Sequence, residues 1–248
     1  MKIAFLSCDF GVPMFGTAGS STHTQGTVQA IRQLGHQVKV FSSNLGGPVE
    51  ETENTGFYGV PLTGFAQEVE GLLRRERQAI AEHVPPELRA LLHAEYVQKA
   101  LLPVLTEFQP DAIYERYSLF AYGGIELANH FGIPHLLEVN APLSEQATKY
   151  RQLIINRTAD HLEERIINSA DAVLVTTQAL ADYAMQLGVP KERISVKPCG
   201  VDPDLFNPKI SGRAVRRRHN LREKQVIGFV GSLKQWHDLD TLVEATQL

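Results

Sequence analysis

A glycine-rich segment follows the first apolar run of the chain and carries residue types that bind anions. Gly16 and Gly19 lie in this segment, and Ser20 and His23 follow where a helix is predicted to begin. Free backbone N–H groups and the positive end of a helix dipole make such a turn favourable for phosphate. We therefore expect these residues to contact a phosphate or a sugar. The glycines do not spell the G-x-G-x-x-G motif, so the dinucleotide fingerprint is incomplete. A plain flexible loop with a capping or surface histidine is the alternative.

Two predicted strands end in polar residues, and their side chains could line a cleft. Charged groups at the end of a buried strand are unusual unless they are paired or face a ligand. Residues two apart on a strand point to the same side. We expect a shared acceptor cleft, with a purely structural ion pair or a turn-capping asparagine as the alternatives. The residues are Glu115 and Arg116 on one strand and Glu138 and Asn140 on the other.

The elements that would position these residues alternate between short apolar runs and longer helical periods. Strands are predicted at 3–8, 37–42, 57–62, 112–117, 135–140, 172–177, 194–198 and 226–231. Helices are predicted over 22–34, 66–83, 87–108, 120–131, 144–168, 178–187 and 239–248, with Ser144 as a candidate cap. This alternation predicts an α/β fold, a Rossmann-like parallel sheet with helices on both faces. Such sheets bind ligands at the carboxyl ends of their strands, where the polar residues above lie.

Length, charge and cysteine content limit the class of protein. The 248 residues suffice for one large domain or one domain plus part of another, and the net charge of −4 gives no general basic face for nucleic acid. Two cysteines, with no H-E-x-x-H or C-x-x-C spacing, support neither a metal site nor a disulfide framework. The apolar start is too short for a signal peptide. We therefore expect a cytoplasmic chain without metal, other cofactor or nucleic-acid partner.

Two regions of the chain, 66–108 and 212–224, are rich in charged side chains. Residues 66–108 combine basic side chains with leucines, a pattern typical of membrane-surface helices, but glutamates interrupt the positive charge. Peripheral contact with the inner face of the membrane therefore stays open beside an ordinary solvated helix pair. The arginines over 212–224 are interpreted as a solvated face at a linker. Nothing in the sequence indicates an oligomeric state.

Five segments, in the correct order, resemble glycosyltransferase family 4. The run GTAGSSTHTQGTVQAIRQLGHQVKVFS resembles the opening of its members. The run ADAVLVTTQALADYAMQLGVPKERISVKPCGVDPDLFNP resembles the end of their N-terminal domain, and VIGFVGSLKQWHDLDTLVEA is similar to the first strand and helix of their C-terminal domain. The segments YERYS and LLEVNAPLSE resemble one bacterial subgroup.

The resemblance implies the N-terminal half of a GT-B fold followed by a truncated second domain. It predicts an acceptor-side domain at 1–205, an interdomain linker at 206–224 and the truncated start of a donor-binding domain at 225–248. The implied reaction is hexosyl transfer, with retention of configuration, from a nucleotide-sugar to a polysaccharide, lipid or small-molecule acceptor. We expect the isolated chain to be inactive because the donor half is missing. A non-catalytic nucleotide- or sugar-binding module that depends on a partner chain is the alternative.

The resemblance also implies roles for individual residues. The residues at the glycine-rich helix start would lie near the donor diphosphate. Arg116 falls where many members have a cleft histidine, and Asn140 falls at another polar cleft position. In the segment G-[RS]-L-x-x-x-K-G of the family, His237 stands where the lysine is usual, so Ser232, Lys234 and His237 are the donor-phosphate candidates. No catalytic nucleophile is implied.

Overall fold

The structure is a computed structural model that describes residues 1–47, 56–80 and 87–246. The chain divides into two compact units, Met1–Cys199 and Gly200–Leu248. The first unit contains the sheet and the helices that pack on it. The second unit contains the short helices α9 (Arg213–Arg218) and α10 (Leu239–Ala245).

The first unit is built on a seven-stranded sheet with the order β3-β2-β1-β4-β5-β6-β7, in which every neighbouring pair is parallel. The strands are β1 (Lys2–Ser7), β2 (Gln37–Ser42), β3 (Phe57–Gly59), β4 (Ala112–Arg116), β5 (His135–Val139), β6 (Ala172–Val175) and β7 (Ile194–Val196). The chain runs outward from β1 to β3 and then returns to β4 on the other side of β1. The strand order therefore reverses between β1 and β4, which is where ligands enter sheets of this type.

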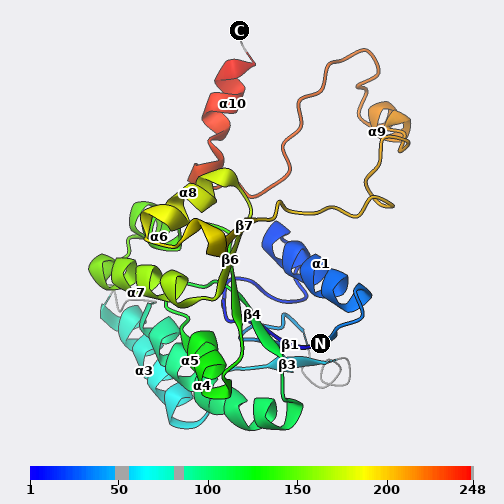
Figure 1. The fold of residues 1–248 in the computed structure, drawn as a ribbon. Coiled ribbons are helices and arrows are strands. Elements are labelled where there is room, and N and C mark those ends of the chain that lie inside the picture. Colours follow the sequence, from blue (N-terminus) through cyan, green and yellow to red (C-terminus); the bar gives the residue numbers. More distant parts are fainter. Residues whose placement is uncertain (48–55, 81–86, 247–248) are drawn as a thin grey trace. The chain divides into compact units, whose positions relative to one another are not determined.

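Helices cover both faces of this sheet, as Figure 1 shows for α1 on one side and α4 and α5 on the other. Alternate strand residues point to opposite faces, so Phe5 and Tyr114 pack with Val28 of α1, whereas Leu6 and Ile113 pack with α4 and α5. The predicted fold class is confirmed. The helices of this unit are α1 (Gly19–Gln33), α3 (Gly64–Ile80), α4 (Glu87–Phe108), α5 (Gly123–Phe131), α6 (Leu143–Arg151), α7 (Asn156–Ser169) and α8 (Gln178–Gln186).

Two predicted elements are wrong. The single helix over 144–168 is two helices, because Gln152 has a left-handed backbone (φ 54°) that ends α6. Ser144 lies inside α6 and is not its cap, since Pro142 occupies that position. The strand expected at 226–231 is absent from the described part of the second unit. A strand needs a neighbour to satisfy its backbone groups, and none of the described residues there provides one.

One close contact between β4 and α5 gives a test of the fold. A Cβ atom on Gly124, in the first turn of α5, would overlap the carboxylate of Glu115. Glu115 is buried and bonded to His135, so it cannot easily move aside. We expect Gly124→Ala to lower the free energy of unfolding, measured by urea denaturation, by about 1–3 kcal/mol.

Gly26→Ala is the matched control, because a Cβ at this position in α1 meets no atom within 4 Å. It should raise the free energy of unfolding by about 0.5–1 kcal/mol, since glycine is unfavourable inside a helix. Equal effects of the two substitutions would contradict the packing of α5 against β4.

Candidate functional site

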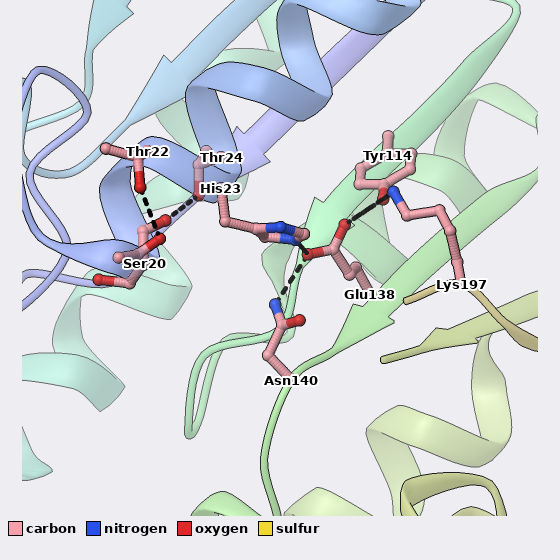
Figure 2. A network of polar contacts seen from close by, with 9 residues as sticks. Ser20, Thr22, His23, Thr24, Tyr114, Glu138, Asn140 and Lys197 are labelled. Atoms are coloured by element: carbon pink, nitrogen blue, oxygen red, sulfur yellow. Dashed lines mark hydrogen bonds and ion pairs between the residues drawn. The ribbon is translucent and has the colours of Figure 1, made fainter. Parts of the chain in front are cut away.

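The centre of the candidate site is the Glu138 carboxylate, near the carboxyl end of β5. Three side chains donate hydrogen bonds to it, as Figure 2 shows. His23 Nε2 lies 2.6 Å from Oε1, Asn140 Nδ2 lies 2.8 Å from the same oxygen, and the Tyr114 hydroxyl bonds to Oε2. Glu138 is only 2% exposed. The carboxylate therefore joins α1, β4 and the end of β5.

Lys197 completes this cluster from the end of β7. Its Nζ donates to the Tyr114 hydroxyl oxygen at 3.2 Å and lies 3.6 Å from Glu138 Oε2. The Lys197 side chain is 43% exposed, so it brings a positive charge from solvent to a buried carboxylate. The sequence analysis missed both Tyr114 and Lys197. Tyr114 lies two residues before Arg116 on the same strand, and residues two apart on a strand point to the same side of the sheet. The sequence pattern could therefore have identified Tyr114.

The electrostatics of Glu138 follow from these contacts. Burial alone would raise its pKa, but the hydrogen bonds from His23, Tyr114 and Asn140 outweigh burial and lower the pKa to about 2. Burial and the neighbouring Glu138 charge raise the pKa of Tyr114, so its hydroxyl keeps its proton. Glu138 therefore stays ionised and accepts three hydrogen bonds, through which it orients the donor groups. Because a carboxylate only accepts, His23 Nε2 is the donor in this contact, and Nδ1 is the ring nitrogen that Glu138 does not engage.

The start of α1 lies beside this cluster and has no side-chain cap. Ala18 occupies the cap position, and the first turn contains no acidic residue. The buried Ser21 Oγ has no hydrogen-bond partner among the described residues, and a Cβ on Gly16 would come within 2.7 Å of it. Gln25 Nε2 holds the preceding turn by donating to the carbonyls of Met14 and Gly16 at 2.8 and 2.9 Å. The N–H groups of the first turn of α1 are therefore suited to bind an anion, whereas the Gly16 N–H already donates to Pro13 O.

The structure brings together most of the predicted residues of the first unit. Gly19, Ser20 and His23 lie in the first turns of α1, and Gly16 lies in the turn just before it. The side chains of His23, Glu138 and Asn140 touch. The predicted same-side orientation of Glu138 and Asn140 is confirmed by their hydrogen bond.

Arg116 pairs with Glu138 in the register of β4 and β5, so both lie at the same edge of the sheet. Its Nη1 lies 3.6 Å from Asp9 Oδ2, and its buried Nε finds no hydrogen-bond partner in the described part of the chain. The arginine–carboxylate pair that the sequence left open is therefore present.

Glu115 is not part of this cluster. It points to the opposite face of the sheet, where its Oε2 lies 2.9 Å from His135 Nε2, and both side chains are buried. The expectation that Glu115 shares a cleft with Arg116 is wrong, because neighbouring residues of a strand point to opposite faces.

Ser232, Lys234 and His237 belong to the second unit, where all three are exposed. They form one continuous turn: Lys234 N donates to Ser232 O, and His237 N donates to Lys234 O, each at 2.9 Å. Within the described residues of the chain, no group of three or more His, Cys, Asp or Glu side chains could hold a metal ion. None of the described helices is long and apolar enough to span a membrane.

Comparison with known proteins now decides the family. Residues 17–205 match the sequence profile of Glycosyltransferase Family 4. The chain belongs to this family. The resemblance carried by the five sequence segments is thereby confirmed.

Individual relatives of this family 4 chain are distant and longer. It is 27% identical over 143 residues to a GDP-mannose-dependent alpha-mannosyltransferase of Mycobacterium tuberculosis, covering 57% of the chain and 37% of that protein. It is 24% identical over 241 residues to a D-inositol 3-phosphate glycosyltransferase of Paenarthrobacter aurescens, covering 94% of the chain and 56% of that protein. The chain thus spans about half or less of the length of these relatives.

Solved structures share the fold. Sucrose-phosphate synthase of Thermosynechococcus elongatus superposes with a TM-score of 0.71 at 19% identity, covering 99% of the family 4 chain and 59% of the synthase. The Anabaena protein HepE in complex with UDP-glucose superposes with a TM-score of 0.61 at 20% identity, covering 99% and 57%. These neighbours are GT-B glycosyltransferases, so the sheet of the first unit has the Rossmann-like form found in that fold.

Proposed function

We propose that the chain is the acceptor-side part of a retaining glycosyltransferase. It would transfer a hexosyl group from a nucleotide-sugar to a polysaccharide, lipid or small-molecule acceptor. The observation that carries this proposal is the Glu138 cluster beside the uncapped start of α1, at the carboxyl edge of the sheet. Family membership and the mannosyl- and glycosyltransferase relatives support it.

Catalysis in this proposal is electrostatic. Negative charge grows on the donor phosphate as the glycosyl bond breaks, and preorganised N–H groups stabilise that charge without moving. The backbone N–H groups of Gly19 and Ser20 would supply such groups at the start of α1, while Gly16, whose N–H donates to Pro13 O at 3.0 Å, would shape the turn before it. No metal or other cofactor is required by this chemistry.

The Glu138 cluster would position the reacting sugars. With Nε2 donating to Glu138, Nδ1 of the His23 ring would be the nitrogen that contacts a sugar hydroxyl. Asn140, whose Oδ1 has no hydrogen-bond partner within the residues that the structure describes, and Arg116 would face the acceptor. Lys197 would hold the cluster together from the end of β7.

We further propose the domain assignment made from the sequence. Residues 1–205 are the acceptor-side domain, 206–224 a linker, and 225–248 the start of a donor-binding domain in which Ser232, Lys234 and His237 contact the donor phosphates. The greater length of the relatives supports this division. The chain would act in the cytoplasm, with or without contact with the inner face of the membrane.

The test begins by reading the coding sequence beyond the codon for Leu248. The product of the complete coding sequence, called here the full-length product, is then assayed with labelled GDP-mannose and UDP-glucose. These are the donors named for the relative and for the HepE complex. We expect transfer by the full-length product, retention of the anomeric configuration by NMR, and no measurable transfer by residues 1–248 alone.

Binding of a nucleotide-sugar without transfer, together with a co-purifying protein that restores transfer, would favour the partner-dependent binding module. An absence of both binding and transfer with a broad panel of nucleotide-sugars would contradict the proposed function.

A further inference from the structure

Helix α6 begins without a cap of its own, three residues after Asn140. Pro142 occupies the cap position and no local side chain accepts from the first N–H groups, which need partners. Glu163, twenty residues later on α7, provides them. Its Oε1 accepts from Leu143 N at 3.0 Å, and Ser144 N lies 3.3 Å from Oε2 and 3.4 Å from Oε1.

The same carboxylate also connects α7 to α8. The Tyr183 hydroxyl donates to Glu163 Oε2 at 2.6 Å. One turn earlier on α7, Asp160 Oδ1 accepts from Ser144 Oγ at 2.5 Å. Backbone and side chain at the start of α6 are thus both held by α7, so the path of the chain into α6 is tightly defined.

This arrangement is costly, which indicates that it serves more than packing. Glu163 is 1% exposed, and burial raises its pKa even though the bonds from Tyr183, Ser144 and Leu143 oppose that effect. A well-packed apolar side chain would avoid this cost of burying a carboxyl group.

The start of α6 is joined to Asn140 by a short segment, so its position affects the Asn140 side chain. Only Ala141 and Pro142 separate Asn140 from Leu143, and the proline ring restricts the backbone between them. Asn140 is one of the three side chains that donate hydrogen bonds to Glu138. The place where α6 starts therefore determines whether the Asn140 amide can reach that carboxylate.

We infer that Glu163 is a positioning residue of the carboxyl-edge site: by fixing the start of α6 it holds Asn140 against Glu138. The inference rests on the proposed function only in taking this site to be the place of sugar transfer. The contact itself can be measured without any transfer activity.

The experiment is NMR on the labelled 248-residue chain carrying Glu163→Gln. A glutamine places an NH₂ group against donors that the carboxylate now accepts from, so the start of α6 should shift. We expect the side-chain amide resonances of Asn140 to move towards those of a free asparagine. The pKa of Glu138, followed by its carboxyl carbon, should rise by roughly half a unit to one unit as one donor is lost. A residue that only stabilises the fold would leave both readouts unchanged in the folded protein.

Glu164→Gln is the matched control, because Glu164 is the exposed neighbour on the same helix and should change neither readout. Tyr183→Phe removes one donor from Glu163 and keeps its charge, so it should move the Asn140 resonances less and in the same direction. If Glu163→Gln does not fold, the Asn140 resonances of Tyr183→Phe test the inference instead.

Wild-type Asn140 resonances and an unchanged Glu138 pKa in the folded variant would overturn the inference. A full-length product that transfers no sugar would leave this measurement intact and would bear only on the proposed function.

Discussion

Replacing Glu138 with glutamine is expected to lower kcat/KM of the full-length product for sugar transfer about 100-fold or more. Glu138 accepts from His23, Tyr114 and Asn140 and lies 3.6 Å from the Lys197 ammonium. A glutamine has one acceptor oxygen, so its NH₂ group must face either the Tyr114 and Lys197 side or the His23 and Asn140 side. Facing His23 and Asn140, the NH₂ group would break the bond that orients His23; facing Tyr114 and Lys197, it would lie against two donors. In both orientations the negative charge beside Lys197 is lost.

The control for this prediction is Glu126→Gln on α5, an exposed glutamate that should leave activity unchanged. Because His23 and Glu138 act as one unit, the double variant His23→Ala, Glu138→Gln should lose little more activity than the worse single variant. Independent, multiplicative losses from the two substitutions would show that Glu138 does not work through His23.

The second large effect is the acid dependence of stability. The pKa of Glu138 is about 2 in the folded chain against an ordinary value of 4.5. The folded state therefore binds this proton less readily than the unfolded state. The stabilising contribution of the Glu138 carboxylate is fully present above about pH 5 and is lost as the pH falls towards 2. The shift corresponds to roughly 3 kcal/mol of the free energy of unfolding.

Urea denaturation of the 248-residue chain between pH 5 and pH 2 measures this contribution. The wild-type curve contains the effects of all carboxyl groups, so the informative quantity is its difference from Glu138→Gln. We expect the stability of the wild type to fall by about 3 kcal/mol more than that of the variant over this range. Tyr114→Phe, which removes one donor and keeps the carboxylate, should give an intermediate slope. Parallel curves for wild type and Glu138→Gln would contradict the depressed pKa.

Local patterns in the sequence predict the fold well where an element depends mainly on its own residues. The alternation of apolar runs and helical periods predicts the seven strands of the sheet, and the helix predicted over 22–34 corresponds to α1. The break between α6 and α7 was missed because it occurs at Gln152, a residue type that gives no warning of a left-handed backbone. The strand expected at 226–231 was predicted from its own residues, whereas a strand also depends on a neighbour.

The candidate site was predictable along each strand and much less so across the fold. Asn140 and Glu138 are two residues apart, so strand geometry alone places them together. The bond between His23 and Glu138 joins residues 115 positions apart, and nothing local to either residue signals it. Lys197 was missed for the same reason. The error over Glu115 has a different origin, because its position next to Arg116 already implied the opposite face.

The most direct test of the central claim is amide chemical-shift mapping of the full-length product titrated with GDP-mannose and UDP-glucose. If the carboxyl edge of the sheet is the sugar-transfer site, one of these donors will shift the backbone amides of Gly19 and Ser20 and the ring resonances of His23. The same resonances should respond more weakly in Glu138→Gln. Saturable donor binding that leaves these resonances unmoved would place the nucleotide-sugar elsewhere and would contradict the assignment of this site.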